Sequence, residues 1–293
     1  MAPKTPTVRC RPINDTDRTA VTDLLSAGFP SRDRRYWVEG LERLSNRQVP
    51  DGCPRYGFLM EADGRAVGSI LLISSWRTSG ETRFKIANVA GWYVHPEFRG
   101  FAQLLVSVAL RNKDLTYLNI SPAPHTWQIV ESQGYTQYCA GLFFAFATLA
   151  RPVSSTRIVQ VSADGNAADI EALAEYDMLR EHASYGCISL VCRSGGNLYP
   201  FIFRPFRIRS GRVWTPAVLA IHCRDQAELV KFAGNLGRFL ALRAMPIIIM
   251  DANGPVAELP GFYSARRGRK YYRGSYHPRL CDLADTEFAI FGL

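Results

Sequence analysis

The chain contains the same landmarks twice, and this repetition constrains its fold more than any other feature. His95 and Gly134 are 39 residues apart, and so are His222 and Gly261, at an offset of 127 positions. Each histidine ends an apolar run with strand character, and each glycine precedes an aromatic residue. Because the order of predicted elements also matches, we interpret the chain as an internal duplication. We therefore expect two domains, residues 1–150 and 151–293.

Apolar periodicity predicts an α/β (α+β) fold class for both halves. In the first half, we expect strands at 7–11, 84–94, 115–120 and 138–149, a hairpin turning at Asp63-Gly64, and helices up to residue 29 and over 36–46, 99–112 and 127–133. In the second half, we expect strands at 157–162, 215–222 and 245–250, a hairpin across 194–197, helices over 167–183 and 226–243, and a last strand in the terminal run EFAIFGL.

Composition excludes several classes of protein. With 47% apolar and 21% charged residues, the chain is neither disordered nor fibrous. The net charge of +9 is shared by both halves, which favours anionic small ligands or acidic partners. We see no apolar stretch of membrane-spanning length and no apolar signal core, so we expect a cytoplasmic protein. Seven cysteines without metal-ligand spacing predict buried free thiols and no metal site.

One segment has the pattern of an anion-binding turn. A strand ending at Val94 leads through His-Pro-Glu-Phe-Arg-Gly directly into a helix. Backbone N–H groups at the start of a helix converge at the positive end of its dipole and suit a pyrophosphate. Residues 99–104 would supply these amides, and the small Gly100 and Ala102 would allow close approach. An ordinary strand–helix connection is the alternative interpretation.

Together, four segments resemble the GCN5-related N-acetyltransferase family over about residues 7–150. These segments are VRCRPINDTDRTAVTDLLSAGF, YGFLMEADGRAVGSILLIS, WYVHPEFRGFAQLLVSVAL and QGYTQYCAG. The resemblance implies two such units, each a twisted mixed sheet flanked by helices. It also implies that the fourth and fifth strands splay apart and that acetyl-CoA or another acyl-CoA lies in the gap as co-substrate.

The family's phosphate motif, Arg/Gln-x-x-Gly-x-Gly/Ala, aligns with a segment of this chain that departs from it. The implied cofactor-binding residues are Val94, Arg99, Gly100, Phe101, Ala102, Gln103 and Leu104. Arg99 matches, Ala102 replaces a glycine, and Leu104 replaces a small residue. After His222, the second half has no glycine at the corresponding place, so we expect a degenerate unit there that covers the acceptor site.

The resemblance also implies catalytic candidates. The main-chain N–H near Val94 would polarise the thioester oxygen, and the position of the family's tyrosine acid holds Val130. Candidates for deprotonating the amine are Glu81, Asn88 through a held water, and His125. In N-myristoyltransferases, which also contain two units of this kind, the terminal carboxylate is the base, so Leu293 is a further candidate.

These observations favour an acyl-CoA-dependent N-acyltransferase that acts by direct attack of an amine on the thioester. The acceptor would be a small or polymeric amine, and an anionic acceptor would suit the cationic run at 264–274. The alternative is a catalytically degenerate unit that binds a ligand or partner. A third interpretation, nucleic-acid binding through 265–273, predicts steeply salt-dependent association and is the one we least expect. No membrane partner is expected.

Overall fold

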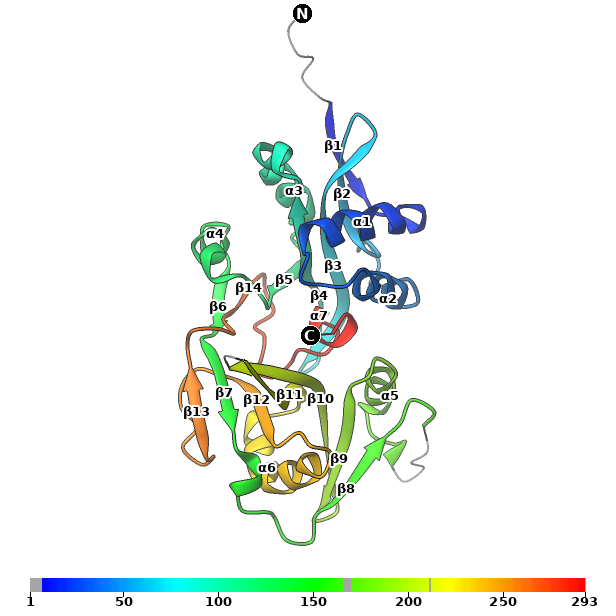
Figure 1. The fold of residues 1–293 in the computed structure, drawn as a ribbon. Coiled ribbons are helices and arrows are strands. Elements are labelled where there is room, and N and C mark those ends of the chain that lie inside the picture. The colour runs from blue at the N-terminus through cyan, green and yellow to red at the C-terminus, as the bar shows by residue number, and fades with distance from the viewer. Residues whose placement is uncertain (1–6, 166–169, 211, 293) are drawn as a thin grey trace, which may run out of the picture. The chain divides into compact units, whose positions relative to one another are not determined.

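The computed structural model describes residues 7–165, 170–210 and 212–292, which fall into two units (Figure 1). The first unit contains residues up to Ile120 together with Tyr272–His277 and Asp285–Phe291, and the second contains Ser121–Tyr271, Pro278–Ala284 and Gly292. Two seven-stranded mixed sheets have the orders β1-β2-β3-β4-β5-β14-β6 and β13-β7-β12-β11-β10-β9-β8. The predicted fold class, two α/β (α+β) units built on mixed sheets with flanking helices, is confirmed.

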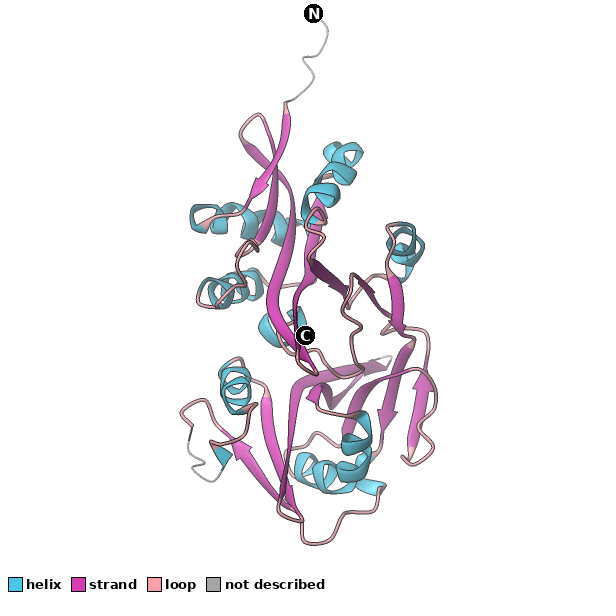
Figure 2. Cartoon of the chain, turned by 180° about the vertical axis from the view of Figure 1, so that it is seen from behind, coloured by secondary structure: helices cyan, strands magenta, loops and turns pink. Residues whose placement is uncertain are grey.

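The first unit is an antiparallel meander that ends in a parallel pair. Its strands are β1 (Val8–Pro12), β2 (Gly57–Ala62), β3 (Arg65–Ser79), β4 (Thr82–Val94) and β5 (Leu115–Asn119), and β5 runs parallel to β4. Helices α1 (Arg18–Gly28) and α2 (Arg34–Ser45) lie on one side of these strands and α3 (Ala102–Ala109) on the other (Figure 2). The helices bury apolar stripes against the sheet, with Val21 and Leu25 of α1 fully enclosed.

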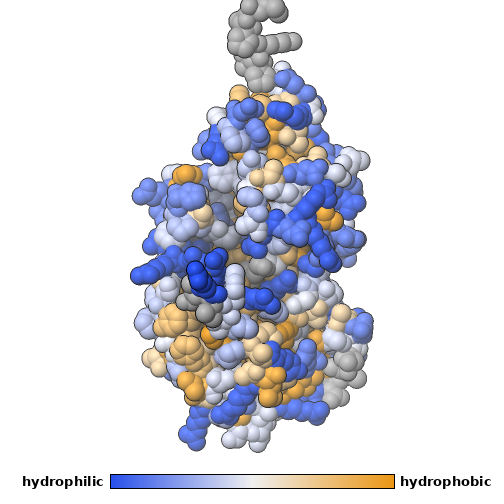
Figure 3. All heavy atoms as spheres, in the orientation of Figure 1, coloured by the Kyte–Doolittle hydropathy of each residue, from blue (hydrophilic) through white to orange (hydrophobic). Residues whose placement is uncertain are grey.

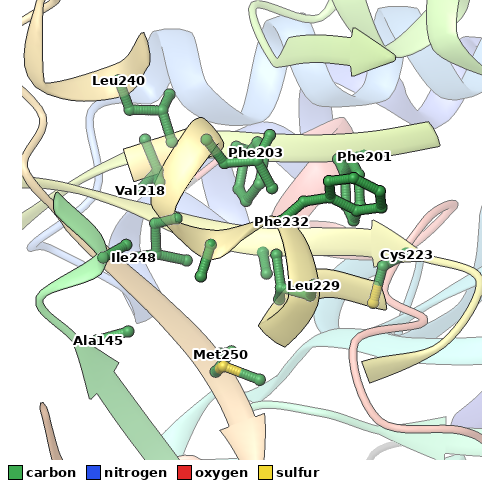
Figure 4. Packing of buried hydrophobic residues seen from close by; sticks show 14 of the residues in the cluster. Ala145, Phe201, Phe203, Val218, Cys223, Leu229, Phe232, Leu240, Ile248 and Met250 are labelled. Carbon is green, nitrogen blue, oxygen red and sulfur yellow. The ribbon is translucent and has the colours of Figure 1, made fainter. Parts of the chain in front are cut away.

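The second unit repeats this plan. Its sheet contains β8 (Arg157–Val161), β9 (Ile188–Ser194), β10 (Asn197–Ser210), β11 (Val213–Cys223), β12 (Ile247–Ala252), β13 (Gly261–Ser264) and β7 (Gly141–Ala145), with helices α5 (Tyr176–Ser184) and α6 (Gln226–Ala241). Phe232 and Leu229 of α6 pack onto Phe201, Ile248 and Met250 of the sheet (Figure 4). This cluster forms the apolar core of the unit.

Sequence order and unit membership do not coincide near residue 120. Helix α4 (Trp127–Ser132) and strands β6 (Thr136–Cys139) and β7 belong to the second unit, where β7 pairs with both β12 and β13. Strand β14 (Lys270–Arg273) leads back into the first unit. The division of the chain's functions at residue 150 stays a prediction, because segments on both sides of that point are exchanged between the units.

Four predicted elements differ from the structure. The strand predicted over 138–149 is broken at Ala140, because Asn253 accepts a hydrogen bond from the Ala140 N–H (2.7 Å) and donates one to the Tyr138 carbonyl (3.1 Å). The terminal run forms a short helix, α7 (Glu287–Ile290), and not a strand. The helix predicted over 99–112 is a 3-10 helix at Pro96–Phe101 followed by α3. The helix predicted over 167–183 begins only at Tyr176, and residues 166–169 lie outside the described part.

No helix in the described ranges has the length and apolar character that a membrane crossing needs. On the face shown in Figure 3, apolar side chains gather mainly over the second unit. All seven cysteines are free thiols, as predicted, but only five are buried, because Cys10 and Cys53 are half-buried.

Candidate functional site

A β-bulge in β4 prepares the candidate site of the first unit. Leu71 of β3 lies opposite Ala90, and Ser69 lies opposite Tyr93, so β4 contains one extra residue at this point. Gly91 adopts a φ of 51°, in the left-handed region that glycine tolerates best. The bulge therefore bends the end of β4 that leads to Val94.

Beyond the middle of β4, the parallel strands part. β4 pairs with β5 only over residues 85–88, opposite residues 115–118. β4 then continues to Val94 with β3 as its partner in the register, whereas β5 ends at Asn119. The edge of β4 from residue 89 to 94 is thus not part of the β5 ladder, and a strand edge without a ladder partner presents N–H and C=O groups to a ligand.

The Val94 amide points toward this edge. The His95 N–H donates to the Val67 carbonyl at 2.8 Å, so the main chain of His95 faces β3. Because N–H groups alternate sides along a strand, the N–H of Val94 faces away from β3, toward the side from which β5 has diverged. The Val94 side chain is buried, which holds the backbone there in place.

The segment predicted to bind pyrophosphate differs from an open turn. Residues 96–101 form a 3-10 helix that begins with Phe98 N–H donating to the His95 carbonyl and ends with Ala102 N–H donating to Arg99. In a 3-10 helix each amide donates to the carbonyl three residues before it. The amides of residues 99–102 are therefore used within the chain, and only those of Gln103 and Leu104 remain outside this helix. This corrects the expectation that all of residues 99–104 offer amides.

Side chains around this segment remain accessible. Arg99 and Gln103 are exposed, and a Cβ placed on Gly100 would meet no atom within 4 Å. Leu104 is 41% exposed and lies on the outer surface of α3, whereas Leu105 and Val106 face the core. Phe101 and Ala102 are half-buried. The main group available to bind an anion at this position is therefore the Arg99 guanidinium, and not a ring of backbone amides.

Glu81 lies far from Val94 within the first unit, and two other proposed bases lie outside that unit or outside the described residues. Glu81 is exposed in the turn before β4, and the 13 residues of that strand separate it from Val94 by about 40 Å at the usual rise per residue. His125 is exposed in a 3-10 helix (Pro124–Thr126) of the second unit. Val130 is buried within α4. Leu293 lies outside the described residues.

Asn88 is occupied by the protein itself. Its Nδ2 donates to the carbonyls of Val89 and Leu118, both at 3.3 Å, and its Oδ1 accepts the Glu287 N–H at 2.8 Å. The side chain is fully buried at the point where β4 and β5 part. Asn88 therefore ties the two strands and α7 together, and its amide is fully enclosed and bonded to the protein at both its nitrogen and its oxygen.

Sequence reasoning missed a clamp on the C-terminal segment of the first unit. Arg47 and Arg77 both contact the Asp285 carboxylate, the latter at 2.6 Å, and all three side chains are at most 14% exposed. The Phe291 ring packs against Trp37 and fills the space above Gly40, where any Cβ would clash with it. More than 200 residues separate Asp285 from either arginine, so no spacing pattern could indicate the clamp.

Two of the five cations in the run at 264–274, Arg269 and Lys270, make structural contacts, whereas Arg273 is exposed. The Lys270 ammonium is buried with the Asp251 carboxylate at 2.6 Å. The Arg269 guanidinium lies 4.0 Å from the centre of the Trp127 ring, and Tyr271 donates to Glu131 at 3.0 Å. Burial raises the pKa of the Tyr271 hydroxyl, and it stays a donor. Arg266 and Arg267 are exposed, so the run offers less cationic surface than its sequence indicates.

Comparisons with known proteins identify the fold. No family model and no curated protein matches the chain. A GCN5-related N-acetyltransferase from Anabaena variabilis superposes with a TM-score of 0.61 at 14% identity, over 91% of this chain and 72% of that one. A GCN5-related N-acetyltransferase from Kribbella flavida (TM-score 0.55, 16% identity, 92% and 71%) and Eis1 from Mycobacterium abscessus (0.55, 14%, 91% and 73%) are also similar. The predicted resemblance is thus confirmed at the level of the fold.

Proposed function

We propose that the chain is an acyl-CoA-dependent N-acyltransferase whose reaction takes place at the diverging ends of β4 and β5. The observation that carries this proposal is the edge of β4 at residues 89–94, which lies beyond the β5 ladder and contains a bulge. Such an edge suits a ligand that carries amide groups along its length, as the pantetheine arm of an acyl-CoA does. Strands β4 and β5 and helix α3 all lie within residues 1–150. We therefore place acyl-CoA binding in that half of the chain and regard residues 151–293 as the degenerate half.

In this proposal, the Val94 N–H donates to the thioester oxygen as negative charge develops there. The neutral amine of the acceptor forms a bond to the carbonyl carbon, the carbon–sulfur bond breaks, and the amine gives up one proton as the thiolate leaves. Val130, which is buried at the position of the family's tyrosine acid, has no proton to donate. The thiolate can leave without an acid, because a thiol has a pKa of about 8.5 and its thiolate is only weakly basic. The Arg99 side chain, with the amides of Gln103 and Leu104, would hold the diphosphate.

One observation favours the second candidate function, a degenerate unit that binds a ligand or partner without turnover. The 3-10 helix uses the amides that a diphosphate would otherwise meet. The two candidates are separated by titration calorimetry with acetyl-CoA, followed by a thiol-release assay over a panel of amines that includes anionic ones. The transferase predicts binding and amine-dependent release of free coenzyme A. Binding without release supports the degenerate unit, and absence of binding at high micromolar ligand contradicts the transferase.

The identity of the base is a separate proposal. If the terminal carboxylate of Leu293 accepts the amine's proton, deletion of Gly292 and Leu293 should lower kcat by about 100-fold, the usual contribution of a general base, without changing the Kd for acetyl-CoA. The matched control is Leu293→Ala, which keeps the carboxylate and should retain kcat. Wild-type turnover in the deletion variant would exclude this base.

We further propose that the enzyme works in the cytoplasm on a soluble amine acceptor. The seven free cysteines support a reducing compartment, where thiols persist. The shared net charge of +9 supports an anionic acceptor, whereas the burial of Lys270 within the cationic run gives nucleic acid little support.

A further inference from the structure

The second unit contains the same strand opening as the first. β11 pairs with β12 only over residues 217–219, opposite residues 247–249, and then continues to Cys223. Ile202 of β10 lies opposite His222, and Phe203 lies opposite Ala220, so Ile221 is the extra residue of a bulge. By the offset of 127 positions, Ile221 corresponds to Val94. Both units therefore contain a bulged strand that extends beyond its parallel neighbour, although the bulge lies two to three residues later in the second unit.

In this unit the free edge is occupied by the chain itself. The Leu283 N–H donates to the Ile221 carbonyl at 2.7 Å, and the Cys223 N–H donates to the Cys281 carbonyl at 3.3 Å. Between these bonds, His222 and Asp282 face each other in an antiparallel bridge. Residues 281–283, which we call the plug, thus add a short strand to β11 on the edge that β12 leaves.

Buried polar groups hold the plug from the side of β12. The Cys281 N–H donates to one oxygen of the Asp251 carboxylate at 3.3 Å, and the other oxygen accepts from Lys270 at 2.6 Å. The side chains of Asp251, Cys281 and Leu283 are completely buried, and Lys270 is 1% exposed. A peptide segment that satisfies buried amides on both sides cannot leave without exposing several unpaired polar groups.

The N-terminus of the helix that follows β11 is also occupied, by a side chain of the protein. α6 begins at Gln226, and the Asp225 side chain accepts the Ala227 N–H at 3.0 Å. A carboxylate already occupies the start of this helix, where a phosphate would compete with it. In the first unit the situation differs, because residues 154–156, which correspond to the plug by the same offset, belong to the second unit. The counterpart of the plug is therefore not part of the first unit.

We propose that residues 281–283 permanently fill the second unit's counterpart of the acyl-CoA cleft, so that each chain binds one acyl-CoA, in the first unit alone. The part of this inference that concerns acyl-CoA rests on the proposed function, whereas the closure of the second cleft does not. The second unit then has a structural role only. Its strand opening was inherited through the duplication and is filled by residues 281–283.

The plug contains a natural reporter, Cys281. We would label the native protein with iodoacetamide, with and without saturating acetyl-CoA, and follow each cysteine by peptide mass spectrometry. Half-buried Cys10 and Cys53 are the internal controls. We expect Cys281 to react at least about 100-fold more slowly than Cys10 under both conditions, because alkylation requires local opening of the plug. A Leu283→Pro variant removes the donor to Ile221 and should accelerate Cys281 while leaving Cys10 unchanged.

Calorimetric stoichiometry completes the test. The expected result is one acetyl-CoA per chain, with weaker binding in Arg99→Glu, together with a protected Cys281. No binding with a protected Cys281 would contradict the proposed function and still support the closed second cleft. Binding of two acetyl-CoA per chain would contradict the proposal that the plug fills the second cleft. So would a Cys281 that reacts at the rate of Cys10 in either condition. The labelling of the wild-type chain decides this even if Leu283→Pro does not fold.

Discussion

Replacing Arg99 with glutamate should weaken acetyl-CoA binding by between about 10-fold and 100-fold, since a hydrogen bond to a charged group contributes about 1.5–3 kcal/mol. The effect is large because the 3-10 helix leaves only the amides of Gln103 and Leu104 beside the exposed Arg99 side chain. The reversed charge would also repel the diphosphate. Titration calorimetry at low ionic strength measures the change in Kd.

The matched control for this prediction is Arg111→Glu. Arg111 is also exposed and follows the other end of α3, so the substitution changes the net charge equally without reaching the proposed diphosphate site. It should leave the Kd within about twofold, since isolated surface charges contribute little. Equal losses in both variants would indicate non-specific attraction, and an unchanged Kd in Arg99→Glu would contradict the proposed site.

Replacing Lys270 with methionine should destabilise the second unit by about 3–5 kcal/mol, because Asp251 would keep a buried charge without a partner. Both groups are at most 1% exposed and lie 2.6 Å apart. Chemical denaturation, followed by fluorescence, measures the free energy of unfolding. The double variant Lys270→Met/Asp251→Asn is the control and should recover most of the loss, since it removes both charges and keeps an oxygen that can accept the Cys281 N–H. An unchanged stability in Lys270→Met would contradict the buried ion pair.

The pH dependence of the same variant follows from the direction of the pKa. Burial by itself would lower the pKa of Lys270, but the charge of Asp251 outweighs burial and raises it above 10.5. A group with a raised folded-state pKa contributes its full stability below the unfolded-state pKa and loses it as the pH rises through the folded-state pKa. The contribution of the Lys270 ammonium to the stability of the wild type should therefore be flat from pH 6 to about pH 9 and be lost only in strongly alkaline solution. In Lys270→Met, the buried Asp251 carboxylate has no cation beside it and takes up a proton more readily, so the stability difference from the wild type should be smaller at pH 5 than at pH 8.

Local patterns were enough to predict most elements. The spacing of Trp37, Leu41 and Leu44 predicted α2, and Asp63-Gly64 predicted the turn between β2 and β3, because these elements bury one face and need a specific turn. The terminal run EFAIFGL was predicted as a strand, and this prediction is wrong. Its apolar residues are buried in helix α7 and by packing of Phe291 on α2, not in a strand ladder. Periodicity cannot distinguish these outcomes in such a short segment.

The candidate site was predictable only in part. Val94 was placed correctly at the end of a strand, but the orientation of its N–H depends on the partner of His95 in β3, which pattern analysis does not reveal. The 3-10 closure of residues 96–101 was not visible, because the same residues fit an open turn equally well. Glu81 and His125 were chosen for their chemistry, and their position in space depends on strand length and on segment exchange between the units.

The amino-acid sequence by itself determined that this protein is a duplicated α/β (α+β) unit, because two copies of His and Gly landmarks at one offset and the matching periodicity of their strands and helices are local properties of the chain. Only the tertiary structure decided which of the two strand openings residues 281–283 fill. The physical reason is that a strand edge can be satisfied by any peptide that reaches it. Which peptide does so depends on contacts between residues far apart in the chain, such as Ile221 and Leu283, which are 62 positions apart.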